Sequence, residues 1–69
     1  MNSDERNTIR RIRDAVNRHV VPREFAPADI NRALAIHWAG VFLPKHRAGN
    51  PGGNTELFVR VDRGRYRLK

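Results

Sequence analysis

The chain has 69 residues, with fourteen Lys and Arg against seven Asp and Glu, a formal net charge of +7 and no cysteine. This length suits one domain over residues 1–69 with a small core, and the lack of cysteine excludes disulfides and thiolate metal sites. No apolar run is long enough to span a bilayer, and the polar start without a signal-peptide pattern predicts a cytoplasmic protein.

The positive charge is concentrated in the last third of the chain. Residues 45–69 hold seven basic and two acidic groups, residues 25–44 hold one of each, and residues 1–24 hold six basic and four acidic groups. Twelve of the fourteen cations are Arg, whose planar guanidinium binds phosphate through two parallel hydrogen bonds. Because a basic pole attracts polyanions, the composition indicates nucleic acid as the partner.

The first predicted element is an amphipathic helix over about residues 4–20. Apolar side chains recur at spacings of three and four along it, and Pro22 ends the pattern. Asn2, followed three residues later by Glu5, fits a helix N-cap. The apolar stripe holds Ile9, Ile12, Val16 and Val20. Polar side chains outside the stripe include Arg6, Arg10, Arg11, Asn17 and Arg18.

Two further helices are expected over about residues 27–34 and 36–43. Before them, Phe25 lies between two prolines, where it would form a short extended segment or strand against the core. Pro27 suits the first position of the second helix. Because residues 36–43 are apolar nearly all round, they should be buried or contact a partner. We expect Trp38 in the core, with a contact to a protein partner as the alternative.

A loop and a β-hairpin are predicted for the rest of the chain. Gly, Asn and Pro cluster in residues 48–54, and apolar and polar residues then alternate over about 56–61 and 65–68. Strict alternation gives one face Leu57, Val59, Val61, Tyr66 and Leu68. It gives the other face Phe58, Arg60, Arg65, Arg67 and Lys69, with Glu56. A bulge that turns Phe58 into the core is the alternative.

The order of these elements and the last residues of the chain together resemble a known fold. Residues 56–68 read Glu-Leu-Phe-Val-Arg-Val-Asp-Arg-Gly-Arg-Tyr-Arg-Leu. This string resembles the terminal F-x-R-V-x-R-G-x-Y-x-L pattern of a small bacterial family of winged-helix-like proteins of unclear function, some of them appendages to restriction-type proteins. The resemblance implies an α+β winged helix, with DNA binding as a common property of that fold.

The candidate nucleic-acid-binding residues all lie in the basic last third. They are Lys45, Arg47, Arg60, Arg63, Arg65 and Arg67. The wing of a winged helix meets the phosphate backbone or a minor groove, where Arg is favoured, and Arg63 at the turn is best placed to enter a groove. Lys45, His46 and Arg47 could add contacts together with free N–H groups of the following loop. The alternative is a solvated surface without a ligand.

The third helix lacks the side chains that usually read DNA sequence. In the common mode, a helix enters the major groove and reads base edges with Arg, Asn or Gln. Residues 36–43 offer His37 and otherwise apolar side chains. The sequence therefore predicts that duplex DNA is bound mainly through its phosphates.

Two other functions remain open at this point. A protein-interaction or homodimerisation module would use the apolar segment 36–43, with Trp38 as a contact. A single-strand nucleic-acid binder would stack bases on Phe58, if that ring lies among the hairpin arginines.

No catalytic constellation stands out in the sequence. Ser3 is the single serine, the three histidines lack metal-ligand spacing, and no phosphate-binding loop pattern is present. We therefore expect no enzymatic activity, no cofactor, no metal, no small-molecule substrate and no membrane association.

Overall fold

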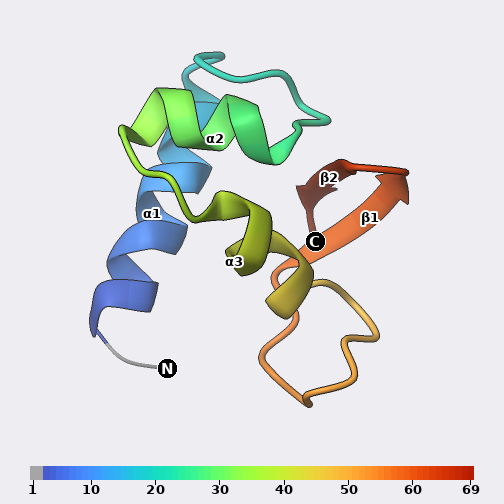
Figure 1. Cartoon of the computed structure of the whole chain (residues 1–69). Helices are drawn as coiled ribbons and strands as arrows, with labels where there is room; N and C mark the ends of the chain where they lie inside the picture. The colour runs from blue at the N-terminus through green and yellow to red at the C-terminus, as the bar shows by residue number, and fades with distance from the viewer. Residues whose placement is uncertain (1–2) are drawn as a thin grey trace.

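The computed structural model describes residues 3–69 and shows three helices followed by a two-stranded antiparallel hairpin (Figure 1). The helices are α1 (Ser3–Asn17), α2 (Pro27–Leu34) and α3 (Ala39–Lys45), and the strands are β1 (Phe58–Asp62) and β2 (Arg65–Leu68). This α+β layout is consistent with the predicted winged-helix arrangement. The predicted cap residue Asn2 lies outside the described residues.

α1 ends three residues earlier than predicted. His19 adopts the left-handed conformation with φ of 59°, and the Val20 N–H donates to the Ala15 carbonyl oxygen at 2.9 Å, as in a Schellman motif. The chain therefore turns, leaving Val20 61% exposed and burying Val21. The prediction that Val20 belongs to the buried stripe is wrong, because the apolar period continues past the point where the backbone leaves the helix.

α2 spans the predicted residues 27–34, and side chains satisfy backbone groups at both of its ends. At its start, the Ala26 N–H donates to Asp29 Oδ2 at 2.8 Å, ahead of Pro27 at the first helical position. At its end, Arg11 Nη2 of α1 donates to the Leu34 carbonyl oxygen at 2.7 Å. Because the last carbonyls of a helix lack helical partners, this bond both completes α2 and joins it to α1.

α3 begins three residues later than predicted and ends two residues later. The Asn31 side chain accepts the Ala39 N–H at 2.9 Å, which fixes the start of the helix. Pro44 lies in the last turn, where its missing N–H costs one hydrogen bond without stopping the helix. Among residues 3–69, no helix is long and apolar enough to cross a membrane.

The hairpin register decides which side chains face the core. Phe58 pairs with Leu68 and Arg60 pairs with Tyr66, but Val61 is an extra residue between two register positions. This bulge shifts the pairing by one residue, so Phe58, and not Val59, shares a face with Tyr66. The strictly alternating faces were therefore wrong, and the alternative with Phe58 in the core is confirmed, since its side chain is 0% exposed.

Aromatic rings join the hairpin to the helices. Phe25 exchanges two backbone hydrogen bonds of 2.8 Å with Tyr66, which confirms the short strand expected there. The Phe58 ring meets the rings of Phe25 and Phe42 edge-on, with centroids 6.1 and 6.0 Å apart. The buried apolar residues form one cluster with contributions from all three helices and both strands. The hairpin is therefore fastened to the core through its inner face, and its outer face remains exposed.

Candidate nucleic-acid interface

The hairpin β1–β2, residues 58–68, is the wing of this fold, and its tip carries two exposed arginines. Arg60 lies on β1 and Arg63 lies in the turn. The Arg63 N–H donates to Asp62 Oδ1 at 2.7 Å, and Gly64 takes a φ of 70°, a value that glycine adopts without strain. Neither guanidinium forms an ion pair with any of residues 3–69. The wing tip therefore presents two positive charges to solvent.

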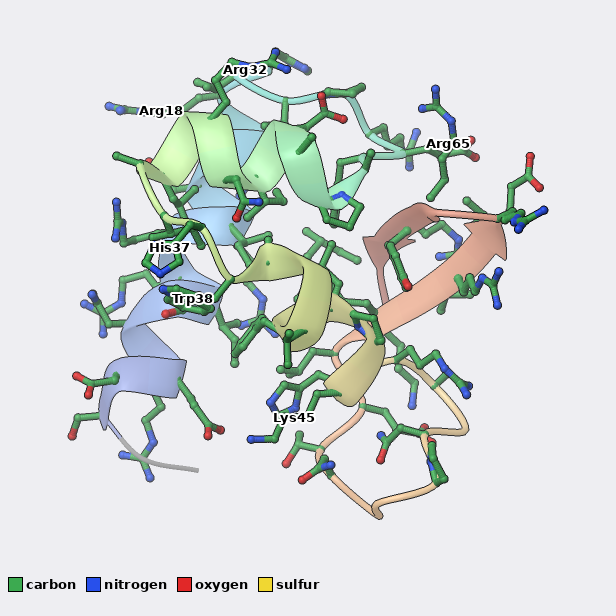
Figure 2. All side chains as sticks on the ribbon, in the orientation of Figure 1. Arg18, Arg32, His37, Trp38, Lys45 and Arg65 are labelled. Carbon is green, nitrogen blue, oxygen red and sulfur yellow. The ribbon has the colours of Figure 1, made fainter. Side chains whose placement is uncertain are left out.

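Arg65 and Arg67 of β2 add two more exposed charges to the wing, on the face opposite to that of Arg60, which pairs with Tyr66. Arg65 Nη1 lies 3.4 Å from the Glu24 carbonyl oxygen, and Arg67 Nη1 lies 3.2 Å from that of Leu68. Figure 2 shows Arg65 beside the connector between α1 and α2, well away from His37 and Trp38. Both residues are exposed, and neither side chain forms an ion pair within residues 3–69, so their charges remain available to an anion.

The two lysines of the basic third are paired with carboxylates. Lys45 Nζ lies 3.7 Å from Glu5 Oε1, and Lys69 Nζ lies 2.8 Å from Glu56 Oε1. The hydrogen bond from Lys69 lowers the pKa of the Glu56 carboxyl below its ordinary value, with help from the Gly49 N–H. Lys45, a predicted phosphate contact, therefore has its charge partly compensated within the fold.

The loop after α3 is tied down by its own side chains. Arg47, also a predicted phosphate contact, is half-buried, and its Nη1 donates to the carbonyl oxygens of Ala48 and Gly49, each at 3.3 Å. The Asn50 side chain donates to the Asn54 carbonyl oxygen at 2.9 Å and accepts the Asn54 N–H at 2.8 Å. The Gly49 N–H donates to Glu56 at 2.7 Å. The N–H groups expected to be free for phosphate are thus largely occupied.

His46, grouped with Lys45 and Arg47 in the sequence, is withdrawn from the surface. Its side chain is 2% exposed, and Nδ1 donates to the Thr55 carbonyl oxygen at 2.9 Å. Nε2 lies 3.7 Å from Glu5 Oε2. His46 therefore joins α1, the end of α3 and the loop, and its buried ring is not available to a phosphate.

The outer surface of α3 is apolar and small. Val41 is 73% exposed and Trp38 is 38% exposed. Trp38 precedes the helix and packs edge-on against Phe42, with ring centroids 5.5 Å apart. The prediction that Trp38 lies in the core is wrong, because α3 starts at Ala39 and leaves the indole at the rim. Figure 2 places His37 and Trp38 on the side of α3 away from the wing.

A second set of arginines, not among the predicted site residues, lies on one flank of α1. Arg6, Arg10 and Arg13, together with Asn17, line a surface hollow of about 590 Å³. Their spacing of four, three and four residues repeats the helical period, so they form a single row. The sequence signal was present, but the acids in residues 1–24 lowered the net charge of the segment and masked the row.

Comparisons with known proteins add no family assignment. The chain matches no protein-family model, no curated protein sequence and no solved structure. The resemblance to the winged-helix family with the F-x-R-V-x-R-G-x-Y-x-L ending therefore stays a prediction. Within residues 3–69, no group of three or more His, Cys, Asp or Glu side chains could hold a metal ion.

Proposed function

We propose that this chain is a small basic winged-helix module that binds duplex DNA in the cytoplasm, mainly through phosphate contacts. The wing arginines supply most of these contacts, and the loop cations Lys45 and Arg47 contribute less because they already have partners. The proposal includes no catalysis and no cofactor.

One observation carries the proposal. All four wing arginines are exposed, and none forms an ion pair within residues 3–69. Asp62 is the one acid of the wing, and its carboxylate accepts the Arg63 N–H. Guanidinium groups without compensating acids bind the closely spaced charges of a phosphate backbone.

The surface of α3 supports backbone binding over reading of base sequence. Its exposed residues are Gly40, Val41 and Lys45, and none of them is an Arg, Asn or Gln that would form paired hydrogen bonds with a base edge. We therefore expect similar affinities for duplexes of unrelated sequence, as for proteins that contact mainly phosphates.

The test is a fluorescence anisotropy titration of a labelled duplex at several salt concentrations. Each neutralised phosphate contributes about −0.9 to the slope of log affinity against log salt. The double variant Arg60→Gln/Arg63→Gln should therefore have a slope shallower by about 1.8 and should bind more weakly at low salt.

The matched control removes the same charge elsewhere. Arg32 on α2 and Arg18 just after the end of α1 are exposed and lie apart from Arg65 of the wing (Figure 2). The variant Arg18→Gln/Arg32→Gln should keep a slope close to that of the unaltered protein. Equal loss in both variants would show that general charge, and not the wing, governs binding. Absence of any binding at low salt would contradict the proposal itself.

The protein-interaction alternative keeps one supporting observation. Trp38 and Val41 are both exposed apolar residues, three positions apart, although Phe42, which follows Val41, is buried. The single-strand alternative loses its motive, because Phe58 is fully buried and offers no ring to a base. Light scattering can test the protein-interaction alternative. If the unaltered chain is a monomer and Trp38→Ser has the same molar mass in solution, homodimerisation through Trp38 is excluded.

A further inference from the structure

The hollow beside α1 is lined by two kinds of side chain. Arg6, Arg10 and Arg13 line it together with Ile9 and Leu57. Ile9 belongs to the core cluster and is only 6% exposed, whereas Leu57 packs against that cluster and is half-buried, so the apolar lining is Leu57 with the edge of Ile9. Asp14 and Asn17 complete it. We call this feature, with these seven residues, the α1 hollow.

The α1 hollow carries excess positive charge. The side chains of Arg6, Arg10 and Arg13 form no ion pair or hydrogen bond with residues 3–69. The one acid of the hollow, Asp14, lies 3.7 Å from Arg18, which is outside it. The neighbouring Arg11 is different, because its side chain donates a hydrogen bond to the Leu34 carbonyl oxygen at the end of α2. The row of three arginines therefore lacks a negative partner.

The apolar lining distinguishes this hollow from the wing. A phosphate backbone is polar along its whole length, so Ile9 and Leu57 would gain nothing from it. A peptide with carboxylates and apolar side chains would match both the charge and the apolar lining. Its carboxylates would pair with the guanidinium groups, and its apolar side chains would be removed from water by contact with the lining. The eleven steps from Arg6 to Asn17 rise about 16 Å along the helix, the length of about five extended residues.

We propose that the α1 hollow binds an acidic segment of a partner protein, with an apolar side chain of that segment seated against Ile9 and Leu57 and its carboxylates on Arg6, Arg10 and Arg13. This interaction is separate from DNA binding by the wing. The chain would thus connect two ligands, a duplex on the wing and an acidic protein segment on α1.

The test uses the full chain and a labelled synthetic peptide of about eight residues, long enough to cover the hollow when extended. The peptide has two central leucines flanked by glutamates. The variant Arg10→Gln/Arg13→Gln removes two charges and keeps side chains that favour helix. It should weaken peptide binding about fivefold and leave the salt slope for duplex DNA unchanged. The wing variant Arg60→Gln/Arg63→Gln should bind the peptide with unchanged affinity and should have a shallower salt slope for duplex DNA.

A second peptide tests the apolar part of the site. Replacing both leucines with glycines should weaken binding roughly tenfold, because the apolar contact is lost. In chemical-shift mapping, the leucine peptide should perturb the amides around Ile9, Arg13 and Leu57. The proposal is overturned if neither peptide binds, if both bind equally, or if the α1 variant loses affinity for the duplex and not for the peptide. Because DNA and peptide are measured separately, failure here is distinct from failure of the DNA proposal.

Discussion

The wing and the flank of α1 present the same charged side chain in two different settings. On the wing, Arg60, which pairs with Tyr66, and Arg63 in the turn are both exposed and form no ion pair within residues 3–69. On α1, Arg10 and Arg13 stand beside a hollow with an apolar lining. Charge alone would give both regions the same ligand. The neighbouring surface separates them, because the wing has the exposed Val61 at its bulge, whereas the α1 hollow has an apolar lining in which a side chain can be seated.

The comparison also explains how arginine can serve structure in one place and binding in another. Arg11 follows Arg10 in sequence, yet it lies on a different face of α1 and donates to the Leu34 carbonyl oxygen at 2.7 Å. A step of one residue turns a side chain by about 100° around a helix axis. Adjacent arginines can therefore have unrelated roles, and each must be assigned from its own contacts.

The largest expected effect is on the free energy of unfolding, and it concerns the buried aromatic ring that joins the wing to the helices. Phe58→Ala should lower the free energy of unfolding by about 3 to 5 kcal/mol, because it removes a fully buried ring that meets Phe25 and Phe42. Urea denaturation followed by circular dichroism measures the change. Val59→Ala, on the outer face of the same strand, is the control and should cost about 1 kcal/mol or less. Similar losses for both would mean that the inner and outer faces are misassigned.

The next largest effect is also on the free energy of unfolding, and it compares Arg11, which is bonded to α2, with Arg10, which lines the α1 hollow. Arg11→Gln should lower the free energy of unfolding by about 1 kcal/mol, because the last carbonyl of α2 loses its charged donor. Arg10→Gln should change it by less than about 0.5 kcal/mol. Thermal melts of the two single variants provide the measurement. If Arg10→Gln is the more destabilising of the pair, Arg10 has a structural role and the ligand-binding assignment of its flank fails.

The smallest expected effect is on the pH dependence of stability, and it concerns Glu56. Because its pKa is lowered in the folded state, first by the Lys69 hydrogen bond, Glu56 contributes stability above the pKa of an unfolded glutamate. That contribution is lost as the pH falls through the lowered folded pKa. Glu56→Gln should therefore show a smaller fall in melting temperature between about pH 5 and pH 3 than the unaltered chain. An equally steep fall would show that other carboxylates govern acid sensitivity. Because Glu56 is exposed, the difference will be small and reduced by salt.

The sequence by itself determined the element order and much of the local structure. The period of the apolar residues gave α1, and Pro27 fixed the start of α2. The composition of residues 48–54 predicted a loop, and the alternation after it predicted two strands, the second with the observed bounds and the first starting two residues too early. These features depend on neighbours in the chain, so a local pattern is enough to specify them. The wing arginines could be singled out as candidate phosphate contacts for the same reason.

Only the tertiary structure decided the features that depend on distant contacts. The start of α3 depends on Asn31, eight residues earlier, and this contact places Trp38 outside the helix. The faces of the hairpin depend on one bulged residue, Val61, which a strict alternation cannot reveal. The α1 hollow needs Leu57, forty residues or more from the arginines beside it. Charge can be counted along a chain, but whether a charge is paired, buried or placed beside an apolar surface is settled by packing.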